Sequence, residues 1–214
     1  MSRVCHGDME QHTHSAWSTS HHAIRREPVV FGHALEHLLA DVELLQPRAQ
    51  EALAGLGLSL HEPLHAAYPG AVWVGAIHVL SDALYPHLSP SRAHVALGRR
   101  FMEKTLQSRL GAAMNAHARA IGPERMLSRL SHQFRMMNNF LGVSVHERPA
   151  HAGWELVIRP LPEFLLLPGV HGEPPHFTRG ALTTAFQAAG VSGVRMNLVD
   201  HDATLGASVF HVTF

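Results

Sequence analysis

The sequence predicts an α+β fold in which an N-terminal bundle of five to six helices packs on a C-terminal antiparallel β-β-α-β-β sheet module. Three observations support this class. Apolar residues recur at intervals of three and four over residues 31–137, which is typical of amphipathic helices. From residue 140 onward they alternate with polar residues in several segments, which is typical of half-buried strands. Short connections join both pairs of predicted strands, and such connections favour antiparallel pairing.

The first 28 residues differ from the rest, because they are polar and show no periodicity up to Pro28. They predict a disordered, histidine-rich tail. Its imidazoles could bind a transition metal weakly, or the tail could be solvated without a specific ligand. Residues 29–214 are expected to form a single α+β domain, with a helical part at 29–137 and the β-β-α-β-β part at 138–214.

Prolines and glycines divide the helical part. Pro47, Pro69 and Pro123 stand where helices are expected to begin, since proline fits the first turn of a helix. Gly111 is expected to kink or break a long helix. The expected helices cover residues 31–46, 48–56, 69–86, about 91–110, 114–121 and 124–137.

The strand-rich part begins at Asn138 and Asn139, where the apolar period changes from about 3.6 to about 2. A hairpin is expected there, with its loop at 148–153. The intervening helix should be capped by Thr178 and end at Gly190. The other expected elements are loops at 58–68 and 161–175, a helix at 179–189, strands at 194–198 and 209–214, and a turn at 200–206.

Composition excludes several classes of protein. Seventeen basic and seventeen acidic residues give a formal net charge of zero, which argues against a nucleic-acid surface. No run of about 18 apolar residues is present, so no membrane-spanning helix is expected. The N-terminus lacks the apolar core of a secretory signal. Cys5 is the single cysteine, which favours a reducing compartment, and we expect a cytoplasmic location.

No catalytic motif is recognisable, since neither a nucleophile elbow nor a glycine-rich phosphate loop is present. Two groups of residues have a spacing that is compatible with metal binding or with acid–base catalysis. His33, His37 and Asp41 are spaced four apart and could hold a metal, although an exposed polar helix face is the simpler explanation. Asp200 and Asp202 flank His201 and could form an acid–base site, but turn chemistry explains these residues equally well.

Methionines gather where the helix at 124–137 meets the hairpin. Thioether side chains line adaptable pockets, and they also fill irregular gaps in ordinary cores. We predict a ligand pocket of ~300 Å³ or more between this helix and the sheet. Its predicted lining is Met126, Leu130, Phe134, Met137, Phe140, Trp154 and Phe186.

Several short sequence segments, taken in order along the chain, resemble segments of a known protein family. They are Ala67-Tyr68-Pro69 with Val72-Trp73, Leu97-Gly98-Arg99-Arg100-Phe101, Gly122-Pro123-Glu124-Arg125, Phe134-Arg135 with Asn138-Asn139, Ala188-Ala189-Gly190 and the final Phe210-His211-Val212-Thr213-Phe214. Together they resemble the large myxobacterial paralogous family of unknown function over about residues 30–214.

The order of elements is also similar to that of four-vinyl-reductase-like and haem nitric-oxide-binding domains. This fold-level resemblance implies a small molecule or haem bound between the helices and the sheet. It also implies an axial histidine on the helix before the sheet, where His132 lies. The sequence lacks the Tyr-x-Ser-x-Arg haem-propionate motif, so we predict neither haem nor any other cofactor.

We therefore expect a non-catalytic module that binds a small apolar molecule and acts in sensing or regulation, with a protein partner or a second copy of the chain as a possible contact. The alternatives are a haem-binding sensor using His132, an uncharacterised enzyme with His201 as its candidate base, and a scaffold that only dimerises.

Overall fold

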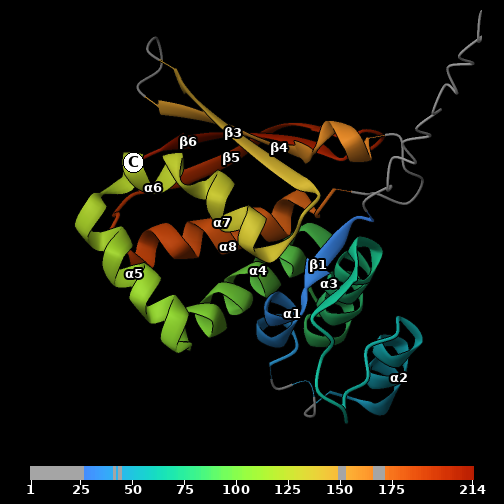
Figure 1. The fold of residues 1–214 in the computed structure, drawn as a ribbon. Coiled ribbons are helices and arrows are strands. Elements are labelled where there is room, and N and C mark those ends of the chain that lie inside the picture. The colour runs from blue at the N-terminus through green and yellow to red at the C-terminus, as the bar shows by residue number, and fades with distance from the viewer. Residues whose placement is uncertain (1–26, 41, 43–44, 149–152, 166–171) are drawn as a thin grey trace, which may run out of the picture.

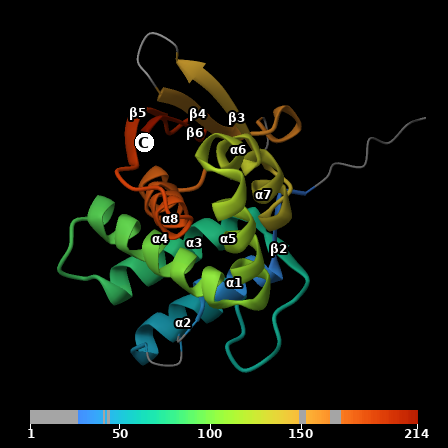
Figure 2. The same cartoon turned by 90° about the vertical axis from the view of Figure 1, so that its left-hand side faces the viewer.

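The computed structural model describes residues 27–214 except 41, 43–44, 149–152 and 166–171. A four-stranded antiparallel sheet forms one layer, and the helices form the other (Figure 1). In both views α6, α7 and α8 lie directly against the sheet, while α1, α2 and α3 lie on the far side of α4 (Figure 2). The predicted α+β class is thereby confirmed.

Apart from two three-residue strands among the first helices, the described elements follow one another in the predicted order. The helices are α1 (Gly32–Leu38), α2 (Pro47–Gly55), α3 (Gly70–Leu84), α4 (Pro90–Gln107), α5 (Arg109–Ile121), α6 (Pro123–Ser128), α7 (Leu130–Met137) and α8 (Pro175–Ala188), with a 3-10 turn at Pro162–Phe164. The strands are β1 (Val29–Phe31), β2 (Ala67–Pro69), β3 (Leu141–Arg148), β4 (Gly153–Pro160), β5 (Arg195–Asp202) and β6 (Ala207–Thr213).

The main sheet has the strand order β3-β4-β6-β5, and all its neighbours are antiparallel. Its inner face carries Leu156, Ile158, Phe210 and Val212, which alternate with less buried residues as a period of two requires. These side chains pack against Phe186 of α8 and against the apolar faces of α6 and α7. The predicted β-β-α-β-β part is therefore correct in order and pairing.

Helices α4 and α8 make the most extensive contact between two described elements. Two glycines permit it. A Cβ atom on Gly98 of α4 would lie 2.1 Å from the carbonyl oxygen of Phe177, and one on Gly180 of α8 would lie 2.2 Å from that of Val95. The two backbones therefore touch directly, and α8, which belongs to the sheet part of the chain, is held inside the helical part.

The α7–β3 junction lies where the sequence predicts a change of period. Asn138 is buried, and its side-chain oxygen accepts hydrogen bonds from the amides of Phe140 and Leu141 at 3.1 and 2.7 Å. The side-chain oxygen of Asn139 accepts one from the amide of Val29 at 2.8 Å. The two asparagines therefore end α7, start β3 and attach β1 to this point.

Two predictions near the start of the domain differ from the structure. The helix expected at 31–46 ends at Leu38, and a short turn follows in which the amide of Val42 donates to the carbonyl of Leu39. The loop expected at 58–68 ends in strand β2, which pairs with β1. Strands of three residues are too short to show a period of two, which explains why this pair was missed.

Two further differences concern the limits of helices. The helix expected at 124–137 breaks at Arg129 into α6 and α7, so that seven helices rather than five or six precede the main sheet within the described residues. Helix α8 begins at Pro175, and Thr178 lies inside it instead of capping it. Gly190 does follow the end of α8 with a positive φ of 90°, as predicted. The predicted tail and hairpin loop fall largely on residues outside the described set.

Thr178 instead bonds a buried carboxyl group. Its hydroxyl donates to Oε2 of Glu173 at 2.9 Å, and the Trp73 side chain makes a second hydrogen bond to the same group. Burial raises the pKa of Glu173 to about 7, although both hydrogen bonds oppose the shift. The neutral acid is therefore the form that this core favours.

The α4–α8 contact gives the first testable prediction. Gly98→Ala should destabilise the fold by about 1–3 kcal/mol, because the added methyl group meets backbone rather than a movable side chain. Gly55→Ala is the matched control, since nothing lies within 4 Å of its Cβ position. The control should be neutral or slightly stabilising. Urea unfolding checks both, and equal stabilities of the two variants would contradict the role of Gly98.

Glu173 gives the second prediction. Its folded pKa of about 7 lies above its ordinary value of 4.5, so its contribution to stability is fully present below pH 4.5 and is lost as the pH rises through about 7. The loss amounts to about 3 kcal/mol. In Glu173→Gln this component should vanish, because the amide is neutral at every pH. Urea unfolding between pH 5 and pH 8.5 measures it, with the exposed Glu62→Gln as control. An unchanged pH profile in Glu173→Gln would refute the assignment.

Candidate functional site

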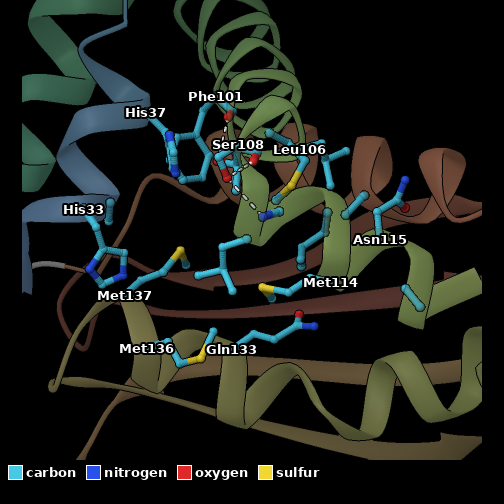
Figure 3. A pocket seen from close by; sticks show the side chains of 18 of the residues that line it. His33, His37, Phe101, Leu106, Ser108, Met114, Asn115, Gln133, Met136 and Met137 are labelled. Atoms are coloured by element: carbon cyan, nitrogen blue, oxygen red, sulfur yellow. Dashed lines mark hydrogen bonds between the residues drawn. The ribbon is translucent and has the colours of Figure 1, made fainter.

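A partly open cavity of about 120 Å³ lies among α1, α4, α5, α7 and α8, with one residue from α6 (Figure 3). It lies on the side of α7 that faces α1, α4 and α5. Its lining consists of His33, Ala34, His37, Phe101, Met102, Thr105, Leu106, Ser108, Leu110, Gly111, Met114, Asn115, Ala118, Met126, Gln133, Phe134, Met136, Met137, Leu182 and Ala185.

The corner between α4 and α5 shapes one wall. Ser108 separates the two helices, and its hydroxyl donates to the carbonyl of Thr105 at 2.7 Å while accepting from the amide of Gly111 at 3.0 Å. A Cβ on Gly111 would lie 1.9 Å from the Thr105 carbonyl oxygen, so the corner requires glycine there. Gly111 thus acts in a helix break, as the sequence predicts, although the break itself lies at Ser108. Leu110 follows the corner and is 62% exposed.

The wall is chiefly apolar. Five of the eight methionines of the chain line it, from α4, α5, α6 and α7. Thioether side chains are flexible and polarisable, so a wall built from them adapts to ligands of different shape. The lining includes no Lys, Arg, Asp or Glu. The cavity is therefore suited to a neutral, largely apolar molecule.

A few polar groups interrupt this wall. His33 and His37 come from successive turns of α1 and lie on one side of the cavity, whereas Asn115 of α5 lies on the other (Figure 3). Burial lowers the pKa of His37, Glu36 opposes the shift, and His33 adds to it. His37 is therefore neutral near pH 7. The Thr105 hydroxyl donates to the carbonyl of Phe101 at 2.9 Å and so already has a partner.

The structure divides the predicted pocket residues into two groups. Met126, Phe134 and Met137 line the cavity. Leu130, Phe140 and Phe186 are no more than 1% exposed and pack together in the core between the helices and the sheet, with Trp154 packed against that core. The cavity therefore does not lie between the last long helix and the sheet, and it is smaller than the ~300 Å³ we expected.

Other candidate residues are placed as follows. His33 and His37 share a helix face, as their spacing predicts, while Asp41 lies outside the described residues. His201 lies in strand β5 rather than in a turn, and its Nδ1 is 3.0 Å from the Ser208 hydroxyl. Its neighbour Asp202 accepts the amide hydrogens of Thr204 and Leu205. The carboxylate thus stabilises the β5–β6 turn.

Sequence reasoning missed the contributions of α4, α5 and α8. Their apolar residues predicted only that each helix has a buried face, and not that the faces of Met102, Met114 and Leu182 meet around a space. The spacing of His33 and His37 was the one available signal. Within the described part of the chain, no group of three or more His, Cys, Asp or Glu side chains is arranged to hold a metal ion. No helix in that part is long and apolar enough to cross a membrane.

The fold is similar to that of H-NOX proteins. An Fe(II) unliganded H-NOX variant from K. algicida has a TM-score of 0.57 and 14% identity, over 86% of this chain and 95% of that chain. A doubly substituted Tt H-NOX has a TM-score of 0.51 and 11% identity, over 85% of this chain and 92% of that chain. The expected fold-level similarity to haem nitric-oxide-binding domains is thus confirmed.

Within this H-NOX-like fold class, the chain belongs to DUF2378, a family of proteins of unknown function whose profile matches residues 28–213. The expectation of a family of unknown function is therefore correct. No curated protein matches the chain.

The residues of this cavity do not fit haem. The expected axial histidine, His132, is exposed and is absent from the lining, and α7 presents Gln133 to the cavity instead. The lining has no Lys or Arg to neutralise the propionates. Its volume of about 120 Å³ is also below the ~300 Å³ at which pockets for drug-sized ligands begin, and haem is larger than most such ligands.

Proposed function

We propose that this chain is a non-catalytic sensory or regulatory module that binds a small apolar molecule in the cavity among α1, α4, α5, α7 and α8. The observation that carries the proposal is the chiefly apolar lining of this cavity, which includes no Lys, Arg, Asp or Glu. Engineered apolar cavities of about 150 Å³ stay free of water and bind benzene or xenon, so a space of comparable size is sufficient for a specific ligand.

The position of the cavity supports a sensory role. Its walls come from the N-terminal part through α1, α4 and α5, and from the sheet part through α8. A ligand there would contact both parts at once and would favour whichever arrangement of the helices gives it more contacts. The change would be passed to a protein partner or a second copy of the chain. We also propose a cytoplasmic location, which agrees with the single cysteine.

This function is proposed to operate without haem, because the donor set and the size of the cavity do not suit haem. An enzymatic role through His201 has weaker support, since the neighbouring Asp202 is bonded within the β5–β6 turn. A purely structural dimer would need no internal cavity. We therefore retain ligand binding as the proposed function.

Benzene is a suitable first probe. In protein labelled with ¹³C at the methionine methyl groups, titration with benzene should shift the signals of Met102, Met114, Met126, Met136 and Met137 in a saturable manner. Met196 is the internal control, because it is buried in the sheet part and does not line the cavity. Unchanged signals from all five cavity methionines in folded protein would refute the proposed function.

A variant that fills the cavity completes this test. Ala185→Leu places three additional carbon atoms against the space and should weaken benzene binding at least tenfold. Ala118→Leu fills it from α5 and serves as the second variant if Ala185→Leu does not fold, as judged by circular dichroism. Benzene affinity that is unchanged in a folded filling variant would place the binding elsewhere.

Haem addition tests the competing sensor hypothesis. We expect free-haem spectra and no retained Soret band after gel filtration, because the cavity lacks the required volume and α7 presents Gln133 to it. His132→Ala should behave identically. A retained Soret band that disappears in His132→Ala would support the haem hypothesis instead.

A further inference from the structure

His33 and His37 are two imidazole groups that the proposed function does not use. They lie four residues apart in α1, and both border the cavity (Figure 3). Side chains with this spacing share one face of a helix, with their Cβ atoms about 5–6 Å apart. Neither imidazole forms a hydrogen bond with any residue that the structure describes. A nitrogen lone pair of each ring is therefore available to a metal ion.

A thioether group reaches the same part of the cavity from the end of α7. Met137 lines the cavity, and Figure 3 shows it on the same side as the two histidines. The next residue, Asn138, pairs with Val30 of β1, which leads directly into α1. Met137 also packs against the hydrophobic cluster that contains Ala34 of α1. The end of α7 is therefore held against the first turn of α1, where His33 lies.

The chemistry of these three side chains is selective. Imidazole nitrogen binds zinc, copper, iron and nickel, whereas thioether sulfur is a soft ligand that favours Cu(I). The hard cations Mg²⁺, Ca²⁺ and Mn²⁺ prefer carboxylate oxygens, and the cavity lining includes no Asp or Glu. Since the set contains only two histidines beside the thioether, it agrees with the lack of a cluster of three His, Cys, Asp or Glu side chains among the described residues.

The electrostatic surroundings also suit a monovalent cation. The cavity lining includes no Lys or Arg that would repel a metal ion. Glu36 precedes His37 in the chain, and its negative charge favours a positive charge at that imidazole. The cost of moving an ion from water into an apolar medium rises with the square of its charge, so Cu(I) is far less costly to bury here than a divalent ion.

We propose that His33, His37 and Met137 form a Cu(I) site at the α1 end of the cavity. The proposal goes beyond the proposed function, because it rests on these three side chains and not on the apolar remainder of the wall. A bound ion would connect α1 with α7 through its ligands. Because the ion binds the folded chain, it would also stabilise the fold.

Titration of the full chain with Cu(I) tests the site. The ion is supplied in the absence of oxygen with ascorbate present, and it is followed through the ¹³C signals of the methionine methyl groups, since Cu(I) is diamagnetic. The Met137 signal should shift in a saturable manner. The signal of Met196 should not change, because this residue is buried in the sheet part. An unchanged Met137 signal would overturn the proposal.

Three variants each remove one ligand, and their affinities for Cu(I) are measured by competition with a colorimetric Cu(I) chelator. They are His33→Ala, His37→Ala and Met137→Leu. Loss of a partner that only orients a ligand costs about 10–100-fold in metal affinity, so loss of a ligand itself should weaken binding by at least about tenfold. Met126→Leu is the matched control and should bind Cu(I) as the wild type does. Met126 lines the same cavity but packs with the core beneath the sheet.

The outcomes separate the site from other sources of copper binding. Equal affinity in the wild type and in all three ligand variants would place the ion elsewhere, such as on the histidines of residues 1–26, and would overturn the proposal. A loss in the histidine variants with Met137→Leu unchanged would refute the thioether ligand, and with it the selection of Cu(I). Should an alanine variant not fold, as judged by circular dichroism, His33→Gln or His37→Gln is measured in its place.

Zn²⁺ is the comparison ion. It should bind these residues more weakly than Cu(I), because structural zinc sites are built from four ligands and rarely include a thioether. Zinc binding as tight as that of Cu(I), and equally sensitive to the three variants, would refute the assignment to copper. The benzene titration is carried out without copper, so a failure of the proposed function and a failure of the copper site are distinguishable.

Discussion

The direct backbone contact between α4 and α8 is the constraint on which the rest of the structure depends. Gly98 and Gly180 remove the side chains that would otherwise separate the two helices. Helix α8 can then serve two cores at once, with Phe177 in the helical core and Phe186 beneath the sheet. The same helix contributes Leu182 and Ala185 to the cavity wall. The position of the cavity therefore follows from how closely two helices approach each other, and not from any residue of special chemistry.

Much of the fold could be predicted from local patterns, because periodicity and punctuation are local properties. The four strands of the main sheet, the helix α8 with Gly190 after it, and the Asn138–Asn139 junction all have such signals. The cavity had fewer signals, which were the methionines of residues 126–137 and the spacing of His33 and His37. Met126, Phe134 and Met137 show that their helices have apolar sides, but α7 contacts apolar surroundings both toward the sheet and toward α4 and α5. A helical period of about 3.6 in the apolar residues shows that a helix has apolar sides, but not which of these sides packs against other side chains and which borders a cavity.

The comparison with H-NOX proteins extends to the fold and not to the chemistry of the site. The backbone arrangement is shared at 11–14% identity. In this chain the side chains around the cavity are chiefly methionine, leucine, phenylalanine and alanine, and His132 lies one position away from Gln133, which lines the cavity. A shift of one residue along a helix turns a side chain by about 100°, which is enough to exclude it from a cavity. The function of a protein with this fold therefore has to be inferred from the residues that face its cavity.

The hydrogen bond between Trp73 and Glu173 has a spectroscopic consequence. The indole N–H is bonded to a carboxyl group that changes charge near neutral pH, in a core shared with Phe101 and Phe177. Indole emission responds to the charge of its hydrogen-bond partner, so we expect the emission of Trp73 to change as Glu173 ionises. The change in emission would report the charge of Glu173 in the helical core, beside the first turn of α8, the helix that contributes to both cores.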